Sequence, residues 1–143
     1  MEFSKRSTPE EQLHNEVIAF IKKSVYPYPS PARPTLLTFI NHPTPQKAIK
    51  DSQGEEYYPD IVIINTEIDK VVMIGEVETE STINDKELKQ WQKFSELCSV
   101  FYIFYPKGNY ERISKLCEKI KVTGFFEYEK VSDKYIITRR WPT

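Results

Sequence analysis

The sequence lacks the long apolar run that a membrane-spanning helix requires. Such a helix needs about 18 consecutive apolar residues, and none of the apolar stretches reaches this length. The first twelve residues are polar and contain no hydrophobic segment of the kind found in secretory signal peptides. We therefore expect a cytoplasmic protein with no membrane among its partners.

Cysteine and histidine are also scarce, with two of each in the chain. Cys98 and Cys117 lack the spacing of a CxxC motif, so we expect two reduced thiols in the core of a cytoplasmic protein. His14 and His42 do not complete a ligand pattern with them, which argues against a zinc site.

A strong net charge is absent as well, because 20 basic and 21 acidic residues leave a formal charge of −1. This balance excludes a histone-like binder, although it allows a local charged patch. Nine tyrosines and eight phenylalanines indicate a packed globule rather than a disordered chain. The length predicts a single domain spanning residues 1–143.

The apolar pattern predicts three helices alternating with strands. Helices are expected at residues 9–25, 84–97 and 110–121, and strands at 35–41, 58–64, 71–78, 100–105, 124–129 and 134–140. Residues 46–56 are expected to form an exposed loop. The order αβββαβ, followed by αββ, is typical of an α/β domain whose mixed central sheet is flanked by helices. The first three strands can be antiparallel neighbours, and the fourth can join in parallel through a right-handed crossover.

Three acids stand where two neighbouring strands meet. Asp60 begins one strand, and Glu76 and Glu78 end the next. Strand alternation puts Glu76 and Glu78 on one face, about 7 Å apart, together with Val72 and Ile74. Antiparallel pairing sets Asp60 beside Glu76, with Cβ atoms about 5 Å apart. Clustered carboxylates at an apolar core call for a cation such as Mg²⁺, unless they form a solvated strand end.

These residues also resemble a known signature. The run Pro59-Asp60, then a turn, then Gly75-Glu76-Val77-Glu78 resembles the active site of the PD-(D/E)XK nuclease superfamily. The element order over about residues 10–105 resembles its restriction-endonuclease-like core. The resemblance implies a metal-dependent DNA endonuclease that hydrolyses phosphodiester bonds with Mg²⁺ or Mn²⁺. It also implies that Asp60 and Glu76 are catalytic metal ligands and that the Val77 backbone carbonyl is a third ligand.

Two further acids enter through the same resemblance. Glu16 resembles the first-helix glutamate that often joins such sites, although it also fits a solvated boundary position beside the apolar stripe. Glu78 stands where the family usually has lysine. Glu78 then acts as a general base or helps to hold a second ion, or else the site binds metal poorly and does not cut.

Residues on the second helix are candidates for supporting roles. Lys86 and Lys89 are candidates to replace the missing lysine, and Gln90 resembles a glutamine that related nucleases place near the metal. Trp91 has the spacing of a core residue. The expected partner is DNA, and a homodimer would present one site to each strand. The alternative from another class is a catalytically inactive domain of the same fold that binds nucleic acid or a protein.

Overall fold

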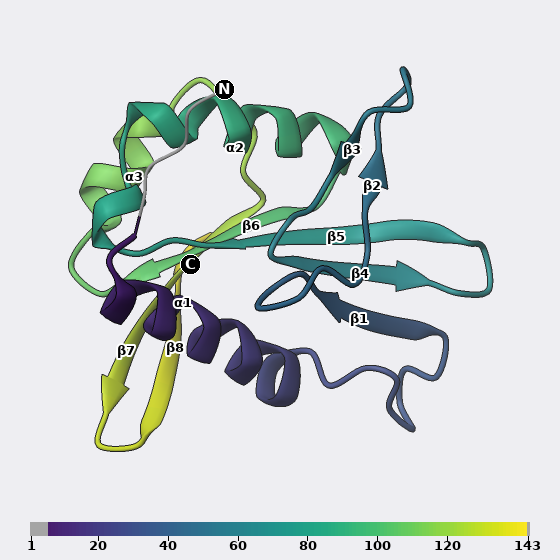
Figure 1. The fold of residues 1–143 in the computed structure, drawn as a ribbon, viewed down its shortest axis with the longest axis horizontal. Coiled ribbons are helices and arrows are strands. Elements are labelled where there is room, and N and C mark those ends of the chain that lie inside the picture. The colour runs from purple at the N-terminus through teal and green to yellow at the C-terminus, as the bar shows by residue number, and fades with distance from the viewer. Residues whose placement is uncertain (1–5, 143) are drawn as a thin grey trace.

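Residues 6–142 are described by the structure, a computed structural model, and they form helices packed on a central sheet (Figure 1). The helices are α1 (Thr8–Phe20), α2 (Asp85–Leu97) and α3 (Tyr110–Leu116), with a π-helical turn η1 (Ile21–Val25) and a 3-10 turn η2 (Glu80–Thr82). The strands are β1 (Leu36–Ile40), β2 (Ile49–Lys50), β3 (Glu56–Tyr57), β4 (Ile61–Asn65), β5 (Lys70–Val77), β6 (Phe101–Pro106), β7 (Gly124–Val131) and β8 (Lys134–Trp141).

The main sheet is mixed and has six strands in the order β1-β4-β5-β6-β7-β8. Strands β1, β4 and β5 form an antiparallel meander, β5, β6 and β7 are parallel, and β8 returns antiparallel to β7. The predicted α/β class, the meander, the parallel pairing of β5 with β6 and the terminal hairpin are all confirmed. Among residues 6–142, no helix is both long enough and apolar enough to cross a membrane.

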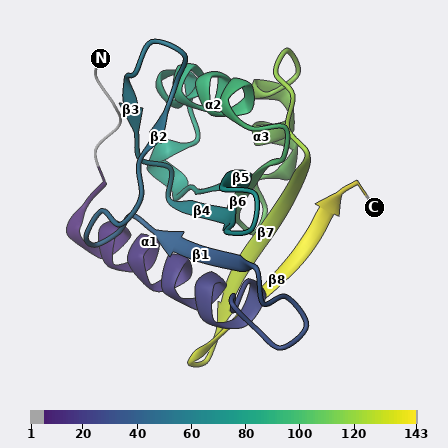
Figure 2. The ribbon, with the colours of Figure 1, turned by 90° about the vertical axis from the view of Figure 1, so that its right-hand side faces the viewer.

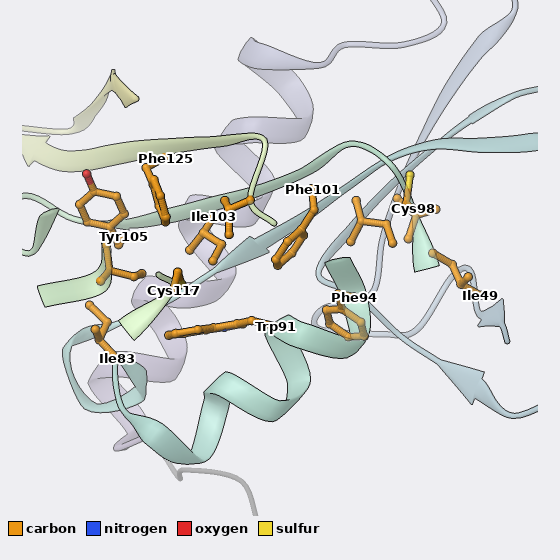
Figure 3. Packing of buried hydrophobic residues seen from close by; sticks show 14 of the residues in the cluster. Ile49, Ile83, Trp91, Phe94, Cys98, Phe101, Ile103, Tyr105, Cys117 and Phe125 are labelled. Carbon is orange, nitrogen blue, oxygen red and sulfur yellow. The ribbon is translucent and has the colours of Figure 1, made fainter. Parts of the chain in front are cut away.

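The sheet is covered on both faces. Helix α1 lies against one face, and α2 and α3 lie against the other (Figure 2). Val17, Ile21 and Phe104 belong to the buried cluster on the α1 side. Trp91 and Phe101 belong to the larger cluster on the α2 side (Figure 3), where the rings of Phe94 and Phe101 meet edge to face. The predicted packing role of Trp91 is therefore confirmed.

Both cysteines lie in the cluster on the α2 side, where they are buried and free, as predicted. Burial, with a smaller contribution from the charge of Glu78, raises the pKa of the Cys117 thiol to about 12. This thiol therefore stays protonated at neutral pH.

Helix α1 begins one residue earlier than predicted. Ser7 is the N-cap and accepts a hydrogen bond from the Glu10 N–H. The helix packs its apolar stripe, including Val17, against the sheet and also buries His14 and Ile18. Glu16, two positions after His14, is exposed to solvent.

Three other expectations were wrong in detail. The expected loop at residues 46–56 contains the strands of a small β2–β3 hairpin, and α3 ends at Leu116 rather than at residue 121. A register shift between Ile63 and Ile64 inserts a bulge in β5, because Ile63 pairs with Met73 and Ile64 pairs with Val71. Val72 therefore packs on the α1 face, whereas Ile74 belongs to the α2 face.

Candidate active site

The ends of β4 and β5 bring Asp60 and Glu76 together. Ile61 pairs with Gly75, so the next position along β5 lies beside Asp60. The Asp60 N–H donates a 2.7 Å hydrogen bond to Glu76 Oε2, and the Val77 N–H donates a 2.8 Å bond to Asp60 Oδ2. The exposed fractions of Asp60 and Glu76 are only 5% and 3%. The predicted cross-strand proximity of these two acids is confirmed, and both acids are buried.

Two histidines hold the Asp60 carboxylate from the other side. His14 of α1 lies with Nε2 3.1 Å from Asp60 Oδ2, and His42, in the loop after β1, lies with Nε2 3.1 Å from Oδ1. Burial by itself raises the pKa of Asp60, but the charges and hydrogen bonds of the two imidazoles outweigh burial and hold it well below its usual range. The hydrogen bond between His42 and Asp60 also raises the pKa of His42. Asp60 is therefore an ionised carboxylate.

Glu76 has a different environment, between Asp60 and helix α2. Gln90 Nε2 donates a 2.9 Å hydrogen bond to Glu76 Oε1, so the structure brings this helix residue to the acids as expected. Burial, followed by the nearby charges of Asp60 and Glu78, raises the pKa of Glu76 well above its ordinary value. A cation at this position would favour the ionised form of Glu76.

The Glu78 carboxylate lies in the core, with an exposed residue fraction of 1%. Trp91 Nε1 donates a 3.3 Å hydrogen bond to Oε2, while Oε1 has no hydrogen-bond partner among the described residues. Burial and the charge of Asp60 raise the pKa of Glu78 well above its ordinary value. Such a buried, protonated acid is poorly suited to act as a general base toward water arriving from solvent.

Arg6 brings a positive charge that sequence reasoning did not assign to this site. Its guanidinium donates hydrogen bonds to the Val77 carbonyl at 3.2 Å and to Thr79 Oγ1 at 3.0 Å. Its charge opposes the upward pKa shifts of Glu76 and Glu78. No local pattern in the sequence links Arg6 to residues 76–79.

Glu16 is not part of the group around Asp60, contrary to its proposed place in the catalytic set. Its exposed carboxylate accepts hydrogen bonds from Tyr135 Oη at 2.8 Å and Lys130 Nζ at 3.3 Å, both on the β7–β8 hairpin. Glu16 is exposed on α1, whereas His14 two positions earlier is buried, which accounts for this placement. Lys86 and Lys89 are exposed on α2, and Lys89 lines a cavity of about 330 Å³ that also reaches Gln90.

Comparisons with protein-family models, curated proteins and solved structures found no match. The function is therefore argued from the geometry of the site.

A second group of potential ligands adjoins Asp60. Glu11, His14 and His42 each offer one ligand atom, and these atoms all lie within 4.8 Å of one another. The group is spaced so that it can hold a metal ion. His14 is fully buried, while the side chains of His42 and Glu11 are 35% and 44% exposed. Sequence spacing alone had argued against His14 and His42 as metal ligands. The fold nevertheless brings both histidines close to Glu11.

Proposed function

We propose that the protein is a metal-dependent nuclease that hydrolyses phosphodiester bonds in DNA. The observation that carries the proposal is the Asp60–Glu76 pair, two buried acids hydrogen-bonded to each other's strand ends. Burying adjacent acids without a cation is costly, and the raised pKa of Glu76 reflects that cost. The order of the helices and strands is consistent with a restriction-endonuclease-like core, in which these acids occupy the metal-ligand positions.

The donor set suits a hard divalent cation, Mg²⁺ or Mn²⁺. Each carboxylate oxygen has about two lone-pair sites, and each oxygen of Glu76 accepts one hydrogen bond. Arg6 occupies one lone pair of the Val77 carbonyl and leaves the other for a ligand bond. Asp60 Oδ2 already contacts His14 and the Val77 N–H, but Oδ1 contacts only His42 and keeps one lone pair. Asp60 Oδ1, Glu76 and the Val77 carbonyl would therefore hold the ion. When bound, it supplies positive charge that activates water and stabilises the developing phosphorane.

The roles of the surrounding residues follow from their contacts. Gln90 orients Glu76 through its amide. Arg6 supplies the positive charge that a lysine gives in the resembling family, because its guanidinium lies beside the Val77 carbonyl and Thr79. Glu78 is a positioning residue that ties the end of β5 to α2 through Trp91, rather than a base.

A cavity beside Gln90 has a lining that suits nucleic acid. Tyr57, Tyr58, Lys89, Gln90 and Lys93 line its 330 Å³, together with Glu56 and Phe94. Tyr58 is exposed and offers a ring on which a base can stack, and Lys89 can neutralise a phosphate, whereas Lys93 is paired with Asp51 at 3.2 Å. A strand lying in this cavity would bring its backbone to Gln90 and so toward Glu76.

Cleavage of duplex, branched and single-stranded DNA in Mg²⁺ or Mn²⁺ tests the proposal. Asp60→Asn and Glu76→Gln should each reduce the cleavage rate by about 100-fold or more, because each removes a charged ligand. Glu16→Gln is the matched control and should cleave like the wild type. Equal cleavage by wild type and Glu76→Gln, with both folded, would refute the assigned site. The homodimer stays a prediction, which light scattering can test.

One observation favours the alternative, a non-catalytic domain of the same fold that binds nucleic acid or a protein. Glu78, at the lysine position, is buried against Trp91, and each oxygen of Asp60 already contacts an imidazole. Calorimetric titration with Mn²⁺ discriminates between the two functions. If Glu76→Gln leaves the Mn²⁺ heats unchanged, or if no heat develops at millimolar Mn²⁺ while DNA still binds, the non-catalytic domain is favoured.

A further inference from the structure

The two histidines that hold Asp60 also face a third acid. Their Nε2 atoms approach the two oxygens of Asp60, and their Nδ1 atoms lie 3.7 Å (His14) and 4.0 Å (His42) from Glu11 Oε1. The rings are nearly perpendicular, with centroids 4.8 Å apart. Two imidazoles thus bridge Asp60 on one side and Glu11 on the other.

The hydrogen bonds to Asp60 define which ring atoms are available to a metal. An ionised carboxylate accepts, so each Nε2 carries hydrogen and each Nδ1 is the ring atom left for a metal ion, which displaces the proton of a charged ring when it binds. The distances from Glu11 are too long for hydrogen bonds. His14 Nδ1 is buried with no hydrogen-bond partner among the described residues. Two ring nitrogens and Glu11 Oε1 therefore lie close together, while the Arg6 guanidinium is paired with the other Glu11 oxygen, Oε2, at 3.9 Å.

We propose that Glu11, His14 and His42 bind a divalent transition-metal ion through Oε1 and the two Nδ1 atoms. Asp60 acts as the outer carboxylate that orients both imidazoles. The site is distinct from the Asp60–Glu76 ligand set, and it does not depend on the proposed nuclease function.

The ligand types select the class of ion. Imidazole nitrogen favours Zn²⁺, Fe²⁺, Co²⁺ or Ni²⁺ over Mg²⁺, and two histidines with one carboxylate leave further coordination positions open. Zn²⁺ is the test ion. Ligand bonds of about 2.0–2.1 Å place tetrahedral ligand atoms roughly 3.3 Å apart. The two distances to Glu11, 3.7 Å and 4.0 Å, exceed this by less than 1 Å, and the spread of the whole group, within 4.8 Å, exceeds it by up to about 1.5 Å. The side chains of Glu11 and His42 are partly exposed, so they can move closer to His14 when the ion binds.

Binding of Zn²⁺ to the full chain, after removal of metals with a chelator, tests the site directly. Calorimetry should give one Zn²⁺ per chain, and Co²⁺ should give visible absorption bands that Zn²⁺ abolishes. His42→Ala and Glu11→Gln should each weaken Zn²⁺ binding by about 100-fold or more, because each removes a direct ligand. His14 is fully buried and its replacement can prevent folding, so the two partly exposed ligands are the decisive variants.

The controls separate this site from its neighbours. Glu16→Gln alters an acid on the same helix that points away, and Glu76→Gln alters the acid pair; both should keep Zn²⁺ affinity within about threefold. Unchanged Zn²⁺ binding in His42→Ala, or no wild-type binding at about 100 µM Zn²⁺, would overturn the proposal. Loss of binding in Glu76→Gln but not in His42→Ala would assign the ion to the acid pair. DNA cleavage in Mg²⁺ is a separate readout, so either proposal can fail alone.

Discussion

At the residue scale, Glu78 has an unfavourable environment. Its carboxylate is buried, one oxygen has no hydrogen-bond partner among residues 6–142, and the other accepts a hydrogen bond from the Trp91 indole. Burial and then the charge of Asp60 raise its pKa well above the ordinary value of 4.5. Between these two pKa values the folded chain holds a proton that the unfolded chain has lost. Stability must therefore fall as pH rises through this window.

Replacement of Glu78 by glutamine should remove this pH-dependent loss. Glutamine has the shape of the protonated acid and cannot ionise, so Glu78→Gln should be more stable than the wild type at pH 8, by about 1–3 kcal/mol. At pH 5 the two should differ by less than about 1 kcal/mol, since the acid is then largely protonated in the fold. Urea unfolding in chelator at both pH values measures this. A stability difference that does not change with pH would contradict the assigned protonation state, and Glu16→Gln is the exposed control.

At the element scale, the glycine with the closest neighbours is Gly124, where β7 begins. A Cβ added to Gly124 would lie 3.0 Å from the backbone oxygen of Trp141 and 3.1 Å from Tyr102 Cδ1. The backbone oxygen belongs to the end of β8, so it cannot move aside like a flexible side chain. At Gly75 in β5 the nearest atoms lie at 3.4 Å and belong to side chains.

An alanine should therefore destabilise the fold more at Gly124, at the start of β7, than at Gly75 in β5. Gly124→Ala should destabilise the fold by about 1–3 kcal/mol by displacing the end of β8, as overpacking generally does. Gly75→Ala is the matched control and should lower the free energy of unfolding clearly less. Urea unfolding at one pH compares them, and an equal or smaller loss for Gly124→Ala would show that β8 shifts freely.

The elements also show how far local sequence patterns reach. Runs of apolar residues and capping signals predicted the six main strands and three helices, and the short hairpin fixed the register that pairs Asp60 with Glu76. The bulge at Val72 has no apolar signature, so strict alternation assigned that residue to the wrong face. His14 interrupts the apolar stripe of α1, and a polar residue there was not expected to be buried.

Local sequence patterns could not predict contacts between elements that are distant in the sequence. His14 and His42 meet at Asp60 only because α1 packs under the sheet and the loop after β1 folds back over the helix. Arg6 reaches Val77 across 71 positions of sequence. Spacing rules apply within one helix, strand or turn, and ligands from three elements obey no fixed spacing. For that reason the sequence indicated the acid pair but neither the histidines nor the guanidinium.

At the scale of the whole molecule, charge is nearly balanced, so any DNA binding must come from local cations. Lys89 and Lys93 line the cavity beside Gln90, and Lys93 also lies 5.2 Å from the centroid of the Tyr57 ring. Lys70 is exposed at the opposite end of β5 from Glu76 and provides a matched control. These positions allow the groove to be tested apart from catalysis.

DNA affinity measured over a range of salt concentrations, with Ca²⁺ in place of Mg²⁺, tests the groove. Each neutralised phosphate releases about one counterion, so Lys89→Ala should reduce the slope of log K against log salt by about one. Lys93→Ala should reduce the slope less, because Lys93 is already paired with Asp51 at 3.2 Å. Lys70→Ala should leave the slope unchanged. If all three variants change the slope equally, binding is spread over the surface. If none does, DNA does not occupy the cavity beside Gln90, and the route proposed from that cavity to Glu76 is wrong.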